Sequence, residues 1–151
     1  MQLRIVSISH GITIKEIVMS AITQITYNDG QTPANAKVFY PVNPQQGATP
    51  AMWKTREGSA MAAWALTQRV TSSASRSQVQ TRITIPVMEI IPDGCCTTDI
   101  PKVSYQDIAN IEVSLPLKSV ASDRRDVLAM IRAHVASSTF VDAVLNFEQV
   151  W

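Results

Sequence analysis

The stretch at residues 104–151 carries the pattern that most limits how this chain can fold. From residue 110 the chain alternates, so that one side of an extended backbone carries Ile111, Val113, Leu115 and Leu117, and the other carries Asn110, Glu112 and Ser114. A period of two with one apolar side is typical of a half-buried strand in an antiparallel sheet. Pro116 has no N–H to donate, so we expect strand pairing to weaken there.

Two short helices are predicted to follow this strand. Ser122 and Asp123 favour a helix start, and apolar residues then recur at helical spacing at Val127, Leu128, Ile131 and Val135. Ser137 or Ser138 can cap a second helix, whose apolar residues are Phe140, Val141, Val144, Leu145 and Phe147. Neither helix is long enough to be stable by itself in water. Both must therefore pack on an apolar surface, and the nearest candidate is the apolar face of the preceding strand.

The earlier part of the chain predicts strands joined by turns. Residues 22–27 and 36–40 flank turn residues at 28–30 and are expected to form a hairpin. Further alternation predicts a short strand at 52–56, longer strands at 64–71 and 80–87, and a loop at 91–103. Strands that come first and helices that come last predict an α+β fold with the helices on one face of the sheet.

The length of 151 residues is that of one domain. Within it we expect an N-terminal extension or extra hairpin at 1–20, and a helical region at 122–151. Between them, residues 21–117 are expected to form an N-terminal hairpin and an antiparallel sheet of about five strands.

The composition excludes several classes of function. A formal net charge of +1 rules out a histone-like polycation but leaves room for a local basic surface. We find no targeting segment and no apolar run long enough to span a membrane. The familiar enzyme motifs are absent, so we predict no catalytic residues and no cofactor. The two cysteines, Cys95 and Cys96, are adjacent, which is not the spacing of a zinc site, so we predict no metal.

Two short helices cannot cover a sheet of this size. With a helix diameter of about 10 Å and a strand spacing of about 4.8 Å, they cover two or three strands. The remaining apolar surface and an unpaired sheet edge would stay in water, where they favour pairing with another chain. The sequence therefore predicts an oligomer, most simply a two-fold dimer.

The polar side of the predicted sheet is basic. If the helices cover Ile83, Ile111 and Val113, the opposite face carries Lys54, Arg56, Thr67, Arg69, Gln80, Arg82, Thr84, Asn110 and Glu112. One interpretation is the solvated face that antiparallel sheets often have. The other is a nucleic-acid surface, on which Arg and Lys neutralise phosphates while Thr, Gln and Asn bond unstacked bases of an RNA hairpin.

Three segments in this order and spacing resemble the coat proteins of single-stranded RNA bacteriophages, the leviviruses. The segments are Asn110-Ile111-Glu112-Val113-Ser114-Leu115-Pro116-Leu117, Ser122-Asp123-Arg124-Arg125 and Ser138-Thr139-Phe140-Val141-Asp142-Ala143-Val144. The resemblance begins near Ala21. It implies an intertwined dimer with a continuous sheet, and a structural protein that is not an enzyme. Such a protein assembles in the host cytoplasm into the icosahedral capsid of the virion. Two alternatives stay open: a cellular RNA-binding module that never assembles, and a small α+β enzyme with an unrecognised site.

The resemblance also implies that the polar face binds a hairpin of the phage genome, for packaging and translational repression. Asn110 falls where the family has an RNA-contacting Asn or Asp, and Arg82 falls on a lysine. Gln80 and Thr67 fall on the threonines of the adenine pocket, and Arg69 falls on a neighbouring serine if the preceding turn is one residue shorter. Ile108 occupies the position of a base-stacking tyrosine, which leaves the identity of the hairpin open.

The loop that contains the two cysteines surrounds the capsid symmetry axes in some relatives and forms disulfides there. The resemblance therefore favours a disulfide between subunits at Cys95 or Cys96, with free thiols as the alternative.

Overall fold

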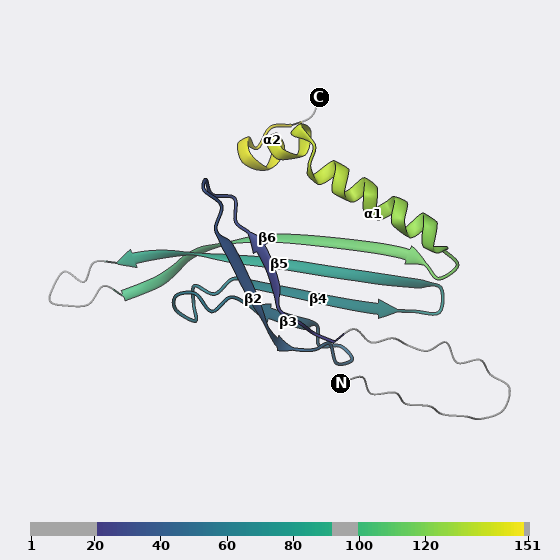
Figure 1. The fold of residues 1–151 in the computed structure, drawn as a ribbon, viewed down its shortest axis with the longest axis horizontal. Coiled ribbons are helices and arrows are strands. Elements are labelled where there is room, and N and C mark those ends of the chain that lie inside the picture. The colour runs from purple at the N-terminus through teal and green to yellow at the C-terminus, as the bar shows by residue number, and fades with distance from the viewer. Residues whose placement is uncertain (1–20, 92–99, 150–151) are drawn as a thin grey trace.

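The computed structural model describes residues 21–91 and 100–149. It contains six strands and two helices: β1 (Ile25–Asn28), β2 (Ala36–Asn43), β3 (Ala51–Lys54), β4 (Ala65–Ser72), β5 (Arg76–Ile91), β6 (Ile100–Pro116), α1 (Ala121–Val135) and α2 (Ser138–Asn146). The strands form one sheet in chain order, and every neighbouring pair is antiparallel (Figure 1). The predicted α+β fold, with strands first and helices last, is confirmed.

The predicted N-terminal hairpin is present as β1 and β2, but it is continuous with the sheet. Tyr40 and Pro41 pair with Lys54 and Trp53 of β3, and the register shifts before Asn43. Because this pairing is short and irregular, the hairpin can turn away from the long strands, and Figure 1 shows it running steeply across β4, β5 and β6. The sheet therefore has six strands rather than about five.

The last two strands are longer than the sequence predicted. Residues 91–103 were expected to form a loop, but Ile91 ends β5 and β6 already begins at Ile100. Two physical reasons explain this extension. The ends of both strands are rich in Ile and Val, which favour strands, and Pro101 is tolerated because β6 is the edge strand of the sheet. Pairing ends at Pro116, as predicted. Cys95, Cys96 and the segment 1–20 lie outside the described residues.

The core of the described chain is small. Its buried hydrophobic side chains are Phe39, Trp53 and Leu66, with Ile22, Ile25, Ala51, Trp64 and Ile83 packed against them. Trp53 and Leu66 are cross-strand partners on β3 and β4, so they lie side by side on one face of the sheet. The indole Nε1 of Trp53 donates to the carbonyl oxygen of Thr23 at 2.8 Å, which fastens the segment before β1 to this core.

The two helices begin in different ways. α1 has Val120 as its N-cap residue with no side-chain cap, so the expected start at Ser122 is wrong. Ser122 lies inside the first turn and donates to Asp123 Oδ1 at 3.2 Å. The cap predicted for the second helix is confirmed, because Ser137 Oγ accepts from the Phe140 N–H at 3.3 Å. α2 ends at Asn146, and its C-cap residue Phe147 has a left-handed backbone with φ 56°.

Neither helix covers the sheet of its own chain. Figure 1 shows α1 and α2 beyond the β6 edge, and neither has a buried residue. The apolar face of the preceding strand, the nearest candidate surface for these helices, is therefore not covered by the helices of the same chain. The short connection at 117–120, in which Ser119 N–H donates to Pro116 O at 3.0 Å, starts α1 beside the edge strand. In the described residues no single helix is long and apolar enough to span a membrane. The two helices taken together, which are bent by 52° relative to each other, have the length and composition of a span.

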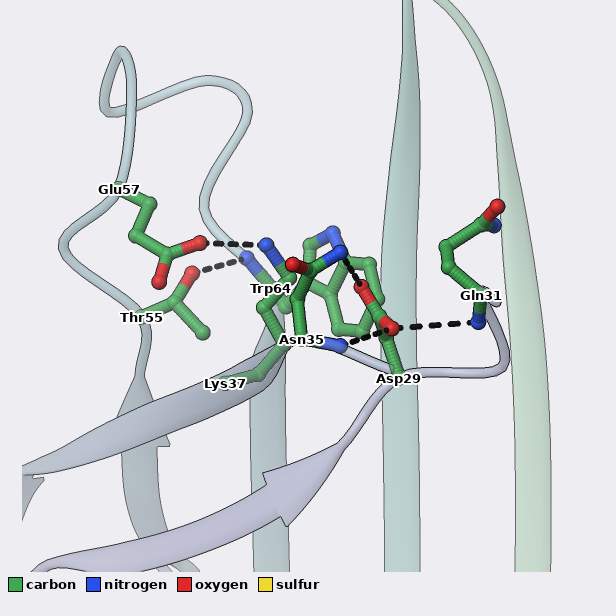
Figure 2. A network of polar contacts seen from close by, with 7 residues as sticks. All are labelled: Asp29, Gln31, Asn35, Lys37, Thr55, Glu57 and Trp64. Carbon is green, nitrogen blue, oxygen red and sulfur yellow. Dashed lines mark hydrogen bonds and ion pairs between the residues drawn. The ribbon is translucent and has the colours of Figure 1, made fainter. Parts of the chain in front are cut away.

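A polar network holds the hairpin against the β3–β4 connection (Figure 2). Lys37 of β2 forms an ion pair with Glu57 at 2.6 Å and lies over the Trp64 ring at 5.6 Å. Buried Thr55 is satisfied, since its Oγ1 accepts from the Trp64 N–H at 2.9 Å. These contacts hold the β1–β2 hairpin in place where few backbone hydrogen bonds join β2 to β3.

A second part of the network shapes the β1–β2 turn (Figure 2). Asp29 Oδ1 accepts from the backbone N–H groups of Asn35 at 2.8 Å and Gln31 at 3.2 Å. The hydrogen bond from the Asn35 N–H is the main reason that the pKa of Asp29 is lowered.

Replacing Leu66 by Ala should lower the free energy of unfolding by about 2–5 kcal/mol, because it removes a buried side chain from a small core. Urea unfolding at one fixed protein concentration measures the change. Val42→Ala is the control, since Val42 is 57% exposed, and its effect should stay within about 0.5 kcal/mol. Equal losses in the two variants would contradict the assignment of Leu66 to the core.

The pH dependence of the turn follows from the lowered pKa of Asp29. The folded state favours the carboxylate, so its contribution is present above the unfolded pKa of about 3.9 and is lost as pH falls through the lower folded pKa. The wild type should therefore lose more stability than Asp29→Asn when the pH is lowered through this range, as measured by urea midpoints at each pH. Parallel pH profiles for the two proteins would argue against a role for this carboxylate.

Candidate nucleic-acid interface

The strand register places the predicted polar residues on one face. Opposite residues of adjacent strands point to the same side of a sheet, and the pairs Thr67–Arg82 and Arg82–Asn110 therefore form one row across β4, β5 and β6. The neighbouring rows on this face are Lys54–Ala65–Thr84–Ile108 and Arg69–Gln80–Glu112. Trp53, Leu66 and Ile83 form a row on the opposite face. The structure thus brings together the eight strand residues that were expected to share a face.

The ninth candidate, Arg56, follows the end of β3 and lies near the same face. Its guanidinium is 4.1 Å from the centroid of the Tyr40 ring, and Tyr40 is the cross-strand partner of Lys54. Stacking on an aromatic ring holds an arginine in place while leaving its N–H groups able to donate. Arg56 is therefore positioned at the rim of the polar face.

This face has a clear excess of positive charge. Its strands carry Lys54, Arg69, Arg76 and Arg82 against the carboxylate of Glu112. The only ion pair among the described residues joins Lys37 and Glu57. Within that part of the chain, no cation of the polar face is therefore neutralised by a salt bridge. A group of unneutralised cations on one face of a sheet attracts polyanions such as the phosphates of RNA.

Glu112 is held by two glutamine side chains from β5. Gln78 Nε2 donates to its Oε1, and Gln80 Nε2 donates to its Oε2 at 3.3 Å. Both bonds cross from one strand to its neighbour on the exposed face. They fix the direction of the carboxylate, and no cation from the described part of the chain forms a salt bridge with it.

A depression of about 370 Å³ lies at the centre of the face. It is lined by Pro50, Thr67, Arg69, Gln80, Thr81, Arg82, Asn110, Ile111 and Glu112. This volume is in the range of small-molecule sites, roughly 300–1,000 Å³. Six of the nine predicted RNA-binding residues are among the lining residues, whereas Lys54, Arg56 and Thr84 lie outside it.

Sequence reasoning missed two residues of this face, Arg76 and Gln78. Both could have been found by extending the alternation of Gln80 and Arg82 toward the start of β5, where Gln78 lies two and Arg76 four residues before Gln80. Their roles need the register, because only the pairing of Gln78 with Ser114, beside Glu112, brings its amide to that carboxylate. Within residues 21–91 and 100–149, no cluster of His, Cys, Asp or Glu side chains could hold a metal ion.

Comparison with known proteins identifies the family. The sequence pattern of the family described as levivirus coat protein matches residues 20–151. This chain belongs to the levivirus coat protein family. It is therefore a capsid protein with a structural role, and its place is the virion. No curated protein matches the chain.

Solved structures of related phages share the fold. The coat protein in the virus-like particle of bacteriophage NT-214 is 29% identical, with a TM-score of 0.81 over 87% of this chain and 100% of that one. The virus-like particle of bacteriophage ESE058 gives 20% identity and a TM-score of 0.80 over 87% and 100%. The capsid protein of bacteriophage GA gives 16% identity and a TM-score of 0.63 over 84% and 95%. The resemblance seen in the sequence is confirmed by these matches.

Proposed function

We propose that this coat protein forms an intertwined dimer, that dimers assemble in the host cytoplasm into an icosahedral shell, and that the polar face binds a hairpin of the genomic RNA. The observation that carries the proposal is the position of α1 and α2, which lie beyond the β6 edge and bury none of their residues.

The helices carry apolar surface that a single chain leaves in water. The exposed fractions are 49% for Leu128, 71% for Leu145 and 89% for Phe147. The sheet also has apolar side chains that are not covered, because Val70 and Ile111 on its apolar face are 44% and 43% exposed. Each buried apolar side chain of this size contributes about 1.5–3 kcal/mol. The largest gain in free energy from burying these side chains is therefore reached when the helices of one copy cover the sheet of another.

The β6 edge offers the route by which two copies can meet. β6 runs from Ile100 to Pro116 at the end of the strand order, so one side of its backbone is unpaired within residues 21–91 and 100–149. A long open edge is a ready template for strand addition. Antiparallel pairing of β6 with the β6 of a second copy about a two-fold axis gives a continuous sheet. It also places α1 and α2 of each copy, which lie beyond that edge, over the apolar face of the other.

Pairing across β6 also extends the polar face. Asn110 and Glu112 lie on the edge strand, so the two basic faces would adjoin along the two-fold axis. The cations of both copies would then face the same RNA. Phosphate contacts supply affinity, and the amide and hydroxyl groups between them contact bases that are not paired.

Replacing Leu145 by Asp should prevent the formation of large particles, because a charge at the covered helix surface cannot be buried without a partner. Sedimentation velocity and negative-stain microscopy of the purified protein measure the outcome. Asn146→Asp adds the same charge at the adjacent polar position and should still give uniform particles. Normal particles from Leu145→Asp would remove this part of α2 from the proposed dimer contact.

Replacing Arg82 by Glu should weaken hairpin binding and lower the slope of log K against log salt concentration by about one or more, because at least one phosphate contact is lost. Filter binding with a hairpin of the phage genome over a range of salt concentrations measures both quantities. Arg132→Glu makes the same charge change on α1 and should leave the slope as in the wild type. An unchanged slope in Arg82→Glu would show that this arginine does not contact phosphate.

A further inference from the structure

The centre of the polar face combines a carboxylate that can only accept hydrogen bonds with a guanidinium that can only donate them. Glu112 accepts one bond on each of its oxygens, from Gln78 and from Gln80. A carboxylate has about four acceptor positions. Each oxygen therefore keeps capacity for one further donor, and the two glutamines hold the oxygens in place for a pair of donors arriving side by side.

The guanidinium belongs to Arg69, which lies in the same row as Gln80 and Glu112. Its Nε–H is buried and has no hydrogen-bond partner among the described residues. Because this Nε–H is out of contact with solvent, a ligand acceptor can approach the guanidinium only through its terminal N–H groups. Arg69 and Glu112 are two strands apart, about 9.6 Å at the usual spacing, and both line the central depression.

A base that fits between these two groups must show donors to Glu112 and acceptors to Arg69. Guanine does so best, because its N1–H and N2–H₂ are adjacent donors, while O6 and N7 are acceptors toward the other side of the ring. Adenine has a single donor group, N6–H₂, and would leave the remaining acceptor position of one Glu112 oxygen unfilled. Cytosine has one donor group as well, and uracil has only N3–H. The arrangement of paired donors beside paired acceptors occurs in guanine alone among the four bases.

We infer that the depression between Arg69 and Glu112 selects an unpaired guanine of the bound RNA. This inference rests on the proposed RNA binding and names the base that the site reads. It also departs from the resemblance, which implied an adenine pocket built on threonines. In this chain Gln80 and Arg69 stand where the resemblance implies small hydroxyl side chains. The side-chain amide of Gln80 donates a hydrogen bond to Glu112.

The test uses the full-length protein in its unassembled form. RNA stem–loops with randomised loops are enriched on the wild type, and each unpaired guanosine of the best binder is then replaced by inosine, which lacks only the 2-amino group. At one position, inosine should weaken binding by about tenfold or more, since a hydrogen bond to a charged group is lost. Adenosine at that position should weaken it at least as much. Filter binding gives each dissociation constant.

Two variants decide whether Glu112 is the group that reads the base. Glu112→Gln keeps the shape of the side chain but offers one acceptor oxygen, so it should bind the guanosine and inosine hairpins equally. Glu89→Gln makes the same change on β5, where Glu89 is exposed on the other face, and should keep the full preference for guanosine.

Three outcomes overturn the inference. The first is an enriched hairpin in which inosine replaces every unpaired guanosine without loss, and the second is a preference for guanosine that persists in Glu112→Gln. Either leaves RNA binding by the face intact. The third is that no hairpin is enriched at all, which overturns the proposed RNA binding together with the inference.

Discussion

The structure depends on apolar surface that one chain cannot cover. A sheet of six strands and two amphipathic helices contain enough apolar side chains for a core, but the buried ones in the described chain are few: Phe39, Trp53 and Leu66. The helices lie beyond the sheet edge, so the apolar faces of sheet and helices do not meet within the chain. Because removing apolar area from water is the main favourable term in folding, most of that term is left for association. In a capsid protein, this exposed apolar surface is available for contacts between copies.

The two faces of the sheet are linked by the period of the strands. In β5 the residues that point toward the apolar face, such as Thr81 and Ile83, alternate with Gln80 and Arg82 on the other. A slip of one residue in register would bring the arginines to the apolar face and the isoleucines to water. The pressure to bury one face therefore also fixes the row in which Arg69, Gln80 and Glu112 stand.

The N-terminal hairpin is held by polar contacts because its strand pairing to the sheet is short. The register shift before Asn43 lets β1 and β2 cross the long strands steeply. The Lys37–Glu57 ion pair and the hydrogen bond from the Trp53 indole to the Thr23 carbonyl then tie the hairpin to the β3–β4 region. An exposed ion pair contributes little by itself. Its value here is to orient an element that packs only at one end.

The sequence by itself determined the order of elements, the alternation of β6, a cap at Ser137 or Ser138, and the family. Alternation, turn chemistry and capping groups are local properties that can be seen within short windows, whereas the family followed from the order and spacing of three segments between residues 110 and 144. The sequence also placed the candidate residues of the polar face together, because alternation along a strand fixes the side to which each residue points.

The tertiary structure decided what depends on distant pairing. The extension of β5 and β6 into the expected loop required partners across the sheet. The hydrogen bond from Gln78 to Glu112 depends on the register between β5 and β6, which cannot be read from the sequence of either strand alone. Above all, the path of α1 beyond the β6 edge was not visible in the pattern, because an amphipathic helix shows that it needs an apolar surface but not which chain supplies it.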